Sequence, residues 1–262
     1  MIKMFVSDLD STLLTHENGN SFIKEDDLEA IRKLHQNNIK LVVASGRMLG
    51  YTLRVLNEYK LDLDVIGTNG ATAYIDKQLL LSHLLDNKTV KKAFAYLVKE
   101  YPEIFIKVSS PDNIEYSYDT LKRIRKNKTD SLIGLEEALN NDSLEMNKIV
   151  ISIDDEKKFY AMMEDFRNRF SDYFEINQST KTHMDVTVKG IDKGTTVKEL
   201  IKSLGYVKED VASIGDSPND ISMFKYTGIS FAMANGHQDV KDNADHIVDN
   251  FAQAVQIVLN SL

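Results

Sequence analysis

The chain has 262 residues, of which 42% are hydrophobic and 27% are charged, and its net charge is −8. This composition is typical of a globular protein with one large domain or two modest ones, and the negative charge argues against nucleic acid as the main partner. The sequence contains no cysteine, which excludes disulfides, thiolate metal sites and cysteine nucleophiles. Any chemistry must therefore come from oxygen and nitrogen groups.

Two features of the sequence bear on location and partners. No apolar run approaches the roughly 18 residues of a membrane span, and the first residues lead into a strand-like segment without a signal-peptide pattern. We therefore expect a cytoplasmic protein with no membrane partner. The basic segment Lys122–Lys128 is a candidate phosphate contact, but a solvated helix face is the favoured interpretation.

The first part of the chain indicates parallel strands joined by helices. The apolar run Ile2–Ser7 is typical of a strand buried on both faces. After a polar loop at residues 18–20, apolar residues at three-residue steps predict an amphipathic helix: Leu28, Ile31 and Leu34. Ile39–Ala44 and Val65–Thr68 follow as further strands, and a right-handed crossover makes the second strand parallel to the first.

The middle of the chain has a looser and more polar pattern, which begins near His83 after a predicted hairpin of Ala71–Ile75 and Leu79–Ser82. The predicted helices of this region are Val90–Glu100, Leu135–Leu139 and Lys157–Phe170. Its predicted strands are Ile104–Val108, Asn113–Tyr118, Lys148–Ile153 and Asp185–Val188. We interpret residues 83–187 as an α+β unit inserted into a first domain of residues 1–82 and 188–262.

The α/β pattern returns at the end of the chain. The predicted elements are a helix at Gly194–Leu204, strands at Val211–Ile214, Gly228–Ala232 and His246–Val248, and a closing helix at Phe251–Leu259. The predicted fold is therefore α/β, a doubly wound parallel sheet with an inserted α+β domain.

Polar residues follow several of these strands at their carboxyl ends, where doubly wound sheets bind ligands. They are Asp8 and Asp10 after the first strand, Ser45 and Gly46 after the second, and Asp216, Asn219 and Asp220 after a late strand, with Lys193 at the start of a helix. Two acids as close as Asp8 and Asp10 repel unless a cation lies between them, and Mg²⁺ is the compact partner for oxygen ligands. The pattern indicates a metal-dependent active site.

Each of these features also has a purely structural explanation. Ser45-Gly46 is an ordinary turn before a helix, aspartates near Pro218 cap a helix, and most lysines are solvated. The capping explanation leaves Asp216 unexplained, since it precedes the serine, whereas a metal accounts for it. A site with four aspartates that also binds phosphate needs a fixed cation, and Lys193 is the candidate. The six histidines show no ligand spacing, and we interpret them as structural or surface residues.

As a set, these motifs resemble the four signature motifs of the haloacid dehalogenase (HAD) superfamily of phosphohydrolases. The matching segments are Asp8-Leu9-Asp10-Ser11-Thr12, Ser45-Gly46-Arg47, Lys193 and Gly215-Asp216-Ser217-Pro218-Asn219-Asp220. The insertion between the second and third motifs resembles the Cof-type branch with its type IIB α+β cap. The resemblance implies a Rossmann-like HAD catalytic core and a cap domain for substrate specificity. Ser11 departs from the glycine that is usual in the first motif.

The resemblance also implies roles for the motif residues. Asp8 would be the nucleophile that forms an aspartyl-phosphate, and Asp10 would protonate the leaving alcohol and later deprotonate water. The implied Mg²⁺ ligands are the Asp8 carboxylate, the Asp10 backbone carbonyl, Asp216 and, behind them, Asp220. The implied contacts to the phosphoryl oxygens are Ser45, the backbone N–H groups of Leu9 and Gly46, Asn219 and Lys193.

The function implied is a Mg²⁺-dependent phosphatase acting on a small phosphorylated metabolite, with a sugar phosphate favoured. Transport ATPases of this chemistry carry threonine at the position of Asp10, which favours rapid hydrolysis here. Two alternatives stay open: a phosphomutase of the phosphomannomutase type, which shares this kind of cap, and a non-catalytic protein that binds a phosphorylated metabolite. We expect a monomer or a weak homodimer.

Overall fold

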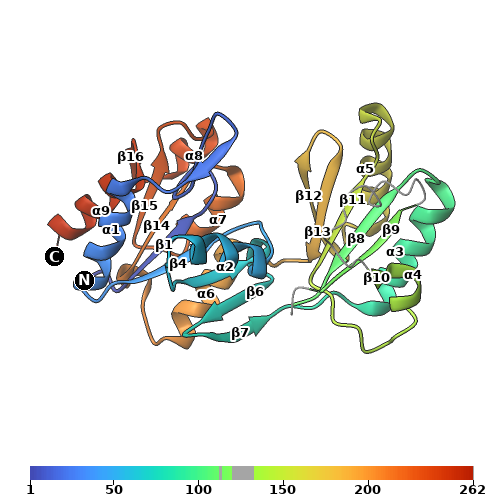
Figure 1. The fold of residues 1–262 in the computed structure, drawn as a ribbon, viewed down its shortest axis with the longest axis horizontal. Coiled ribbons are helices and arrows are strands. Elements are labelled where there is room, and N and C mark those ends of the chain that lie inside the picture. The colour runs from blue at the N-terminus through green and yellow to red at the C-terminus, as the bar shows by residue number, and fades with distance from the viewer. Residues whose placement is uncertain (112–113, 120–132, 262) are drawn as a thin grey trace. The chain divides into compact units, whose positions relative to one another are not determined.

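The computed structural model describes residues 1–111, 114–119 and 133–261, so the basic segment Lys122–Lys128 lies outside the described residues. The chain divides into two compact units (Figure 1). One, which we call the core, comprises Met1–Leu80 and Asp192–Leu262, and the other, the insert, comprises Leu81–Ile191. The α/β prediction with an inserted α+β unit is confirmed. The catalytic and specificity roles of the two units stay predictions.

The core is built on an eight-stranded sheet with the order β16-β15-β14-β1-β4-β5-β6-β7. The strands are β1 (Met4–Asp8), β4 (Lys40–Ala44), β5 (Asp64–Gly67), β6 (Thr72–Ile75), β7 (Gln78–Ser82), β14 (Val211–Gly215), β15 (Ile229–Met233) and β16 (His246–Val248). Strands β16 to β5 in this order are parallel. The chain order runs outward in both directions from β1, and doubly wound sheets bind ligands at the carboxyl end of the strands where such a reversal occurs.

Helices cover both faces of the core sheet. They are α1 (Glu25–Gln36), α2 (Leu49–Glu58), α6 (Lys193–Ser203), α7 (Ile221–Phe224), α8 (Gln238–Asn243) and α9 (Phe251–Asn260). Helices α1 and α9 pack side by side, and α6 and α8 each contact α7. Right-handed crossovers in opposite directions from β1 place these two groups on opposite faces. Every residue of β1 is buried, with Phe5 against Phe231 and Phe251, which explains the apolar run that predicted this strand.

The insert has a six-stranded sheet of its own, with the order β10-β9-β8-β11-β13-β12. Its strands are β8 (Phe105–Ser109), β9 (Glu115–Asp119), β10 (Ile133–Gly134), β11 (Lys148–Ser152), β12 (Phe174–Thr180) and β13 (His183–Val188), and its helices are α3 (Asn87–Glu100), α4 (Leu135–Ala138) and α5 (Glu156–Phe170). Apolar residues of these helices and strands form a second hydrophobic core, which includes Phe159, Phe166 and Met184. Among the described residues, no helix is both long and apolar enough to cross a membrane.

The polar loop predicted at residues 18–20 is instead a hairpin of β2 (Thr15–Glu17) and β3 (Asn20–Phe22). Asn18 and Gly19 form its two-residue turn, and both have positive φ angles, 52° and 78°. Asn-Gly is the preferred sequence for such a turn because it tolerates left-handed backbone. The signal for the hairpin was therefore present in the sequence, although the strands are too short and polar to show a clear alternation.

A tight loop follows β1 and fixes the direction of the chain beyond Asp8. The Ser11 N–H donates to the Leu14 carbonyl at 2.8 Å, and the Leu14 N–H donates to the Leu9 carbonyl at 2.7 Å. Ser11 has a φ of 62°, in the left-handed region that disfavours residues with a Cβ atom. This conformation gives a physical reason for the glycine that is usual at this position of the motif.

We expect the Ser11→Gly variant to be more stable than the wild type by about 0.5–1 kcal/mol, because the steric cost of left-handed serine exceeds the extra unfolded-state entropy of glycine. Urea unfolding followed by circular dichroism measures the difference. Ser203→Gly, in the last turn of α6, is the control and should have the opposite sign. Equal destabilisation by both changes would contradict the conclusion that the left-handed backbone of Ser11 is strained.

Candidate active site

The predicted site residues gather at the carboxyl edge of the core sheet. Asp8 ends β1, Ser45 directly follows β4, and Asp216 directly follows β14. Because β1 pairs with β4 on one side and β14 on the other, these three residues come from neighbouring strands. Lys193 is the first residue of α6 and reaches the same edge.

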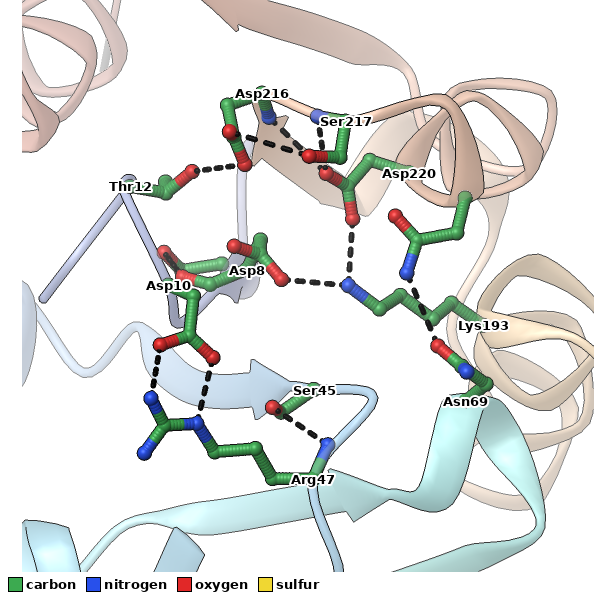
Figure 2. Close-up of polar contacts among 12 residues, drawn as sticks. Asp8, Asp10, Thr12, Ser45, Arg47, Asn69, Lys193, Asp216, Ser217 and Asp220 are labelled. Carbon is green, nitrogen blue, oxygen red and sulfur yellow. Dashed lines mark hydrogen bonds and ion pairs between the residues drawn. The ribbon is translucent and has the colours of Figure 1, made fainter. Parts of the chain in front are cut away.

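Lys193 makes the central contacts of the site. Its Nζ donates to Asp8 Oδ1 and to Asp220 Oδ1, each at 2.6 Å (Figure 2). The side chain is only 1% exposed. Burial on its own would lower the pKa of Lys193, but the carboxylates of Asp220 and Asp8 outweigh burial and raise this pKa above its ordinary value. The ammonium is therefore a fixed positive charge across the physiological pH range.

Asp220 holds the loop after β14 in shape. This carboxylate is fully buried, and its Oδ2 accepts the backbone N–H groups of Asp216 and Ser217, both at 3.0 Å. A Cβ atom on Gly215 would lie 2.3 Å from the Asp220 Cβ, so only glycine fits at the end of β14. Asp220 therefore binds both the lysine and the backbone that carries Asp216.

Asp216 lies beside this pair at the mouth of the site. Its Oδ2 accepts from the Ser217 hydroxyl at 3.2 Å, and its Oδ1 accepts from the Thr12 hydroxyl at 3.4 Å. Burial, followed by the negative charge of Asp220, raises the pKa of Asp216. Burial also raises the pKa of Asp8 well above its usual range, although the Lys193 charge offsets part of this effect. In both residues burial is the main cause of the raised pKa, and the neighbouring carboxylate of Asp220 adds to it.

The donor set of the site fits a hard divalent cation. Asp8, Asp216 and Asp220 each offer a carboxylate oxygen, and these oxygens lie within 4.8 Å of one another. Three carboxylates face one ammonium group, so ionisation of all three leaves an excess negative charge in a largely buried volume. Oxygen ligands of this kind suit Mg²⁺ better than softer metals. The residues present therefore fit the Mg²⁺ that the motifs implied.

Asp10 points away from this network (Figure 2). Its Oδ2 accepts from Arg47 Nε at 2.7 Å, and its Oδ1 accepts from Arg47 Nη2 at 2.5 Å. His16 Nε2 also contacts Oδ1, at 2.9 Å. The sequence-based interpretation of the histidines as structural or surface residues overlooked the contact of His16. The Asn-Gly turn that follows His16 was the available signal, because it folds the hairpin that carries this residue.

The remaining predicted residues border the site. The buried Ser45 hydroxyl accepts the Arg47 N–H at 3.1 Å, and Asn219 Nδ2 donates to Asn69 Oδ1 at 3.0 Å. Helix α2 begins only at Leu49, so residues 45–47 form a loop before the helix rather than its first turn. The Leu9 side chain is fully buried in the hydrophobic core, which leaves only its backbone available for a ligand.

The comparisons with known proteins agree with this geometry. Residues 5–256 match the haloacid dehalogenase-like hydrolase family. The chain is 26% identical over 248 residues to the 5-amino-6-(5-phospho-D-ribitylamino)uracil phosphatase YcsE of Bacillus subtilis, covering 95% of this chain and 90% of that protein. It is 25% identical to phosphoglycolate phosphatase 1 of Saccharolobus solfataricus, and this match also covers 95% of this chain and 90% of that protein.

Solved structures show the same fold. A protein from Thermotoga maritima superposes with a TM-score of 0.84 at 26% identity, covering 99% of this chain and 97% of that one. A HAD subclass IIB sugar phosphatase superposes with a TM-score of 0.78 at 22% identity, covering 98% of each chain. The chain belongs to the haloacid dehalogenase-like hydrolases, as the Cof-type resemblance predicted. Within this family the predicted enzyme class, a phosphatase, is confirmed.

The raised pKa of Asp216 makes a prediction with a definite sign. A carboxyl group whose pKa exceeds its ordinary value of 3.8 in the folded protein binds its proton more tightly there than in the unfolded chain. Its contribution to stability is therefore lost as the pH rises from that ordinary value through the folded-state pKa. Without divalent metal, we expect Asp216→Asn to gain stability relative to the wild type between about pH 4 and about pH 7.

Urea unfolding at the two pH values measures this difference. Asp245→Asn is the control, because hydrogen bonds from Ser230 lower the pKa of Asp245. For that variant the stability difference from the wild type should stay nearly constant over this interval, because a carboxyl group with a lowered pKa contributes its full stability above the ordinary value of 3.8 and loses it only at lower pH. A stability difference between Asp216→Asn and the wild type that does not change with pH would contradict the electrostatic description of the site.

Proposed function

We propose that the chain is a Mg²⁺-dependent phosphatase that hydrolyses a small phosphorylated metabolite through an aspartyl-phosphate intermediate. The observation that carries this proposal is the contact set of Asp8, whose Oδ1 binds the buried ammonium of Lys193 while Asp216 and Asp220 offer oxygens nearby. An anionic nucleophile beside a fixed ammonium group, with carboxylates placed to hold a divalent cation, suits attack on an anionic phosphate.

The proposed chemistry has two steps, both carried by Asp8 at the end of β1 and by Asp10 in the loop that follows. In the first, an Asp8 carboxylate oxygen attacks phosphorus, the bond from phosphorus to the ester oxygen breaks, and the departing oxygen takes a proton from Asp10. In the second, water attacks the phosphorus and gives a proton to Asp10. The bond from phosphorus to the Asp8 oxygen then breaks, which releases inorganic phosphate and restores the Asp8 carboxylate.

The metal in this proposal is held by the Asp8 carboxylate, the Asp10 backbone carbonyl and Asp216. Asp220 stands behind them, because its two oxygens already bind Lys193 and two backbone N–H groups. When bound, Mg²⁺ offsets the repulsion between the anionic nucleophile and the anionic phosphate. The chemistry of the donor set supports this assignment, since all the ligands are oxygen atoms.

The phosphoryl oxygens are bound, in this proposal, by groups around the nucleophile. The groups are Lys193 Nζ, the Ser45 hydroxyl, the Asn219 amide and the backbone N–H groups of Leu9 and Gly46. The buried Lys193 carries a full charge that is shielded from water, so its electrostatic effect on developing charge is larger than that of a solvated lysine. These donors are held before substrate arrives, so little reorganisation is needed during the reaction.

For the substrate we propose a sugar phosphate or a similar small polyhydroxylated phosphate ester. The relatives named above act on a phosphoribityl compound and on phosphoglycolate, and one structural relative is named a sugar phosphatase. The proposed role of the insert, which has a hydrophobic core of its own, is to recognise the leaving group of the substrate. A screen over sugar phosphates, nucleotides and pyridoxal phosphate tests this choice. Release of inorganic phosphate without a bisphosphate activator supports a phosphatase, whereas return of the phosphoryl group to the substrate, without release of inorganic phosphate, would favour a phosphomutase instead.

The nucleophile assignment predicts that Asp8→Asn loses Mg²⁺-dependent hydrolysis of a generic phosphate ester by roughly 10³-fold or more, because an amide cannot form the acyl phosphate. A steady-state phosphate-release assay measures this loss. Asp239→Asn, on the exposed surface of α8, is the control and should keep wild-type activity. Full Mg²⁺-dependent activity in Asp8→Asn would refute the assignment.

The division of labour between Asp10 and Asp216 gives a separate prediction. Asp10→Asn should bind Mg²⁺ as the wild type does but turn over about 10²–10⁴ times more slowly, because only its backbone carbonyl is assigned to the metal. Asp216→Ala should mainly lower the affinity for Mg²⁺, so that activity recovers in part at high Mg²⁺ concentration. Calorimetric titration with Mg²⁺ and activity at saturating metal distinguish the two variants. If Asp10→Asn instead lost affinity for Mg²⁺ but turned over normally at saturating Mg²⁺, the roles proposed for Asp10 and Asp216 would be wrong.

A further inference from the structure

The side chain of Asp10 is held by two residues that none of the proposed steps uses. Arg47 donates hydrogen bonds from Nε and Nη2 to the two carboxylate oxygens of Asp10, and His16 Nε2 contacts Oδ1. We propose that Arg47 and His16 are positioning residues for Asp10, which set the orientation of the carboxyl group that transfers protons. This inference rests on the proposed function, because it assigns a purpose to contacts of its acid–base residue.

Arg47 is itself held in place from two sides. Its backbone N–H donates to the Ser45 hydroxyl at 3.1 Å, and its guanidinium lies over the Tyr51 ring, 4.6 Å from the ring centroid. A planar guanidinium matches a carboxylate with two parallel hydrogen bonds, which fixes orientation more strongly than a single contact. The loop proposed to bind phosphate thus also orients the residue proposed to protonate the leaving group.

His16 approaches Asp10 from the β2–β3 hairpin. Its ring is oriented by a contact of Nδ1 with the Ser21 hydroxyl at 2.8 Å, and Ser21 is the residue directly opposite on β3. Since a carboxylate oxygen accepts hydrogen bonds, the Nε2 atom that contacts Asp10 carries a proton. The hairpin therefore positions one donor against the acid–base residue.

The contacts distinguish the two oxygens of Asp10. Oδ1 receives donors from both Arg47 and His16, whereas Oδ2 receives one from Arg47. A carboxylate oxygen has two principal acceptor directions. The structure thus assigns proton transfer to Oδ2, which keeps one of these directions for the leaving oxygen or the attacking water.

A competing interpretation is that Arg47 binds the phosphate directly. The contacts favour positioning, because two of its guanidinium nitrogens are already directed at Asp10. The two interpretations differ in a measurable way. A positioning residue matters only while Asp10 is present and only where the leaving group needs a proton, whereas a phosphate ligand matters in every background and for every ester.

The experiment compares kcat/KM for an alkyl phosphate, whose leaving group needs a proton, and for p-nitrophenyl phosphate, whose leaving group does not. We expect Arg47→Lys and His16→Ala to lower kcat/KM for the alkyl ester by about 10-fold or more, and for the aryl ester by less than about 3-fold. His16→Gln, whose amide can still donate to Asp10, should keep most of the wild-type value. Arg32→Lys and His35→Ala, both on the exposed surface of α1, are the matched controls.

The same variants are then made in the Asp10→Asn background, where we expect no further loss for either ester. Equal losses for the two esters, or losses that add to that of Asp10→Asn, would overturn the inference. If Arg47→Lys fails to fold by circular dichroism, the pair His16→Ala and His16→Gln decides alone, since His16 lies on an exposed hairpin. If the wild type hydrolyses neither ester, the proposed function fails first and the inference falls with it, so the two failures are distinguishable.

Discussion

The buried ammonium of Lys193 is the interaction on which the rest of the site depends. Taking a lysine out of water is costly unless opposite charges replace the lost hydration, and here Asp8 and Asp220 do so at 2.6 Å each. The backbone brings the lysine to this place because Gly194 packs so closely on α7 that a Cβ atom would lie 2.0 Å from the Ser222 carbonyl oxygen. The start of α6 is thereby fixed against the sheet, and a charge from a distant part of the sequence meets the end of β1.

The first loop separates two aspartates that a strand would otherwise present in the same way. Strand β1 ends at Asp8 and the chain turns at Leu9, so Asp10 does not continue the alternation of the strand. Asp8 therefore faces Lys193, while Asp10 faces Arg47 and His16. Two carboxylates only two residues apart thus lie in different electrostatic surroundings, which is the condition for one to act as a nucleophile while the other transfers protons.

Much of the fold could be predicted from the sequence because its signals are local. A continuous apolar run, such as the one that contains Phe5, is typical of a strand that is covered on both faces. Every residue of β1 is buried in this way. The elements that were missed, which also include β10 and α8, are short or polar and have weak local signals. Strand β12 ends in polar residues, Asn177 to Thr180, and the β2–β3 hairpin is short and exposed. For such segments, pairing with a neighbouring strand decides the structure, and the sequence pattern does not reveal the neighbour.

The sequence indicated which residues would lie close together but not their internal contacts. Asp8, Lys193, Asp216 and Asp220 do lie together, since Asp8 and Asp216 come from the carboxyl ends of adjacent parallel strands and Lys193 begins a helix that reaches the same edge, while their roles stay predictions. The pairing of Asp10 with Arg47 and His16 depends on the rotamers of long side chains and on a hairpin that the sequence analysis had treated as a loop. Such contacts follow from three-dimensional geometry, so spacing along the chain does not disclose them.

The proposed mechanism requires a covalent aspartyl-phosphate intermediate, and acid-quenched single-turnover reactions followed by tandem mass spectrometry can detect it. With Mg²⁺ and a hydrolysed phosphate ester, we predict a phosphoryl group on the peptide that carries Asp8, located on Asp8 itself and absent in Asp8→Asn. Accumulation should be greater in Asp10→Asn if that residue activates the water. Release of inorganic phosphate with no phosphorylated protein under these conditions, or with the phosphoryl group on another residue, would contradict the account.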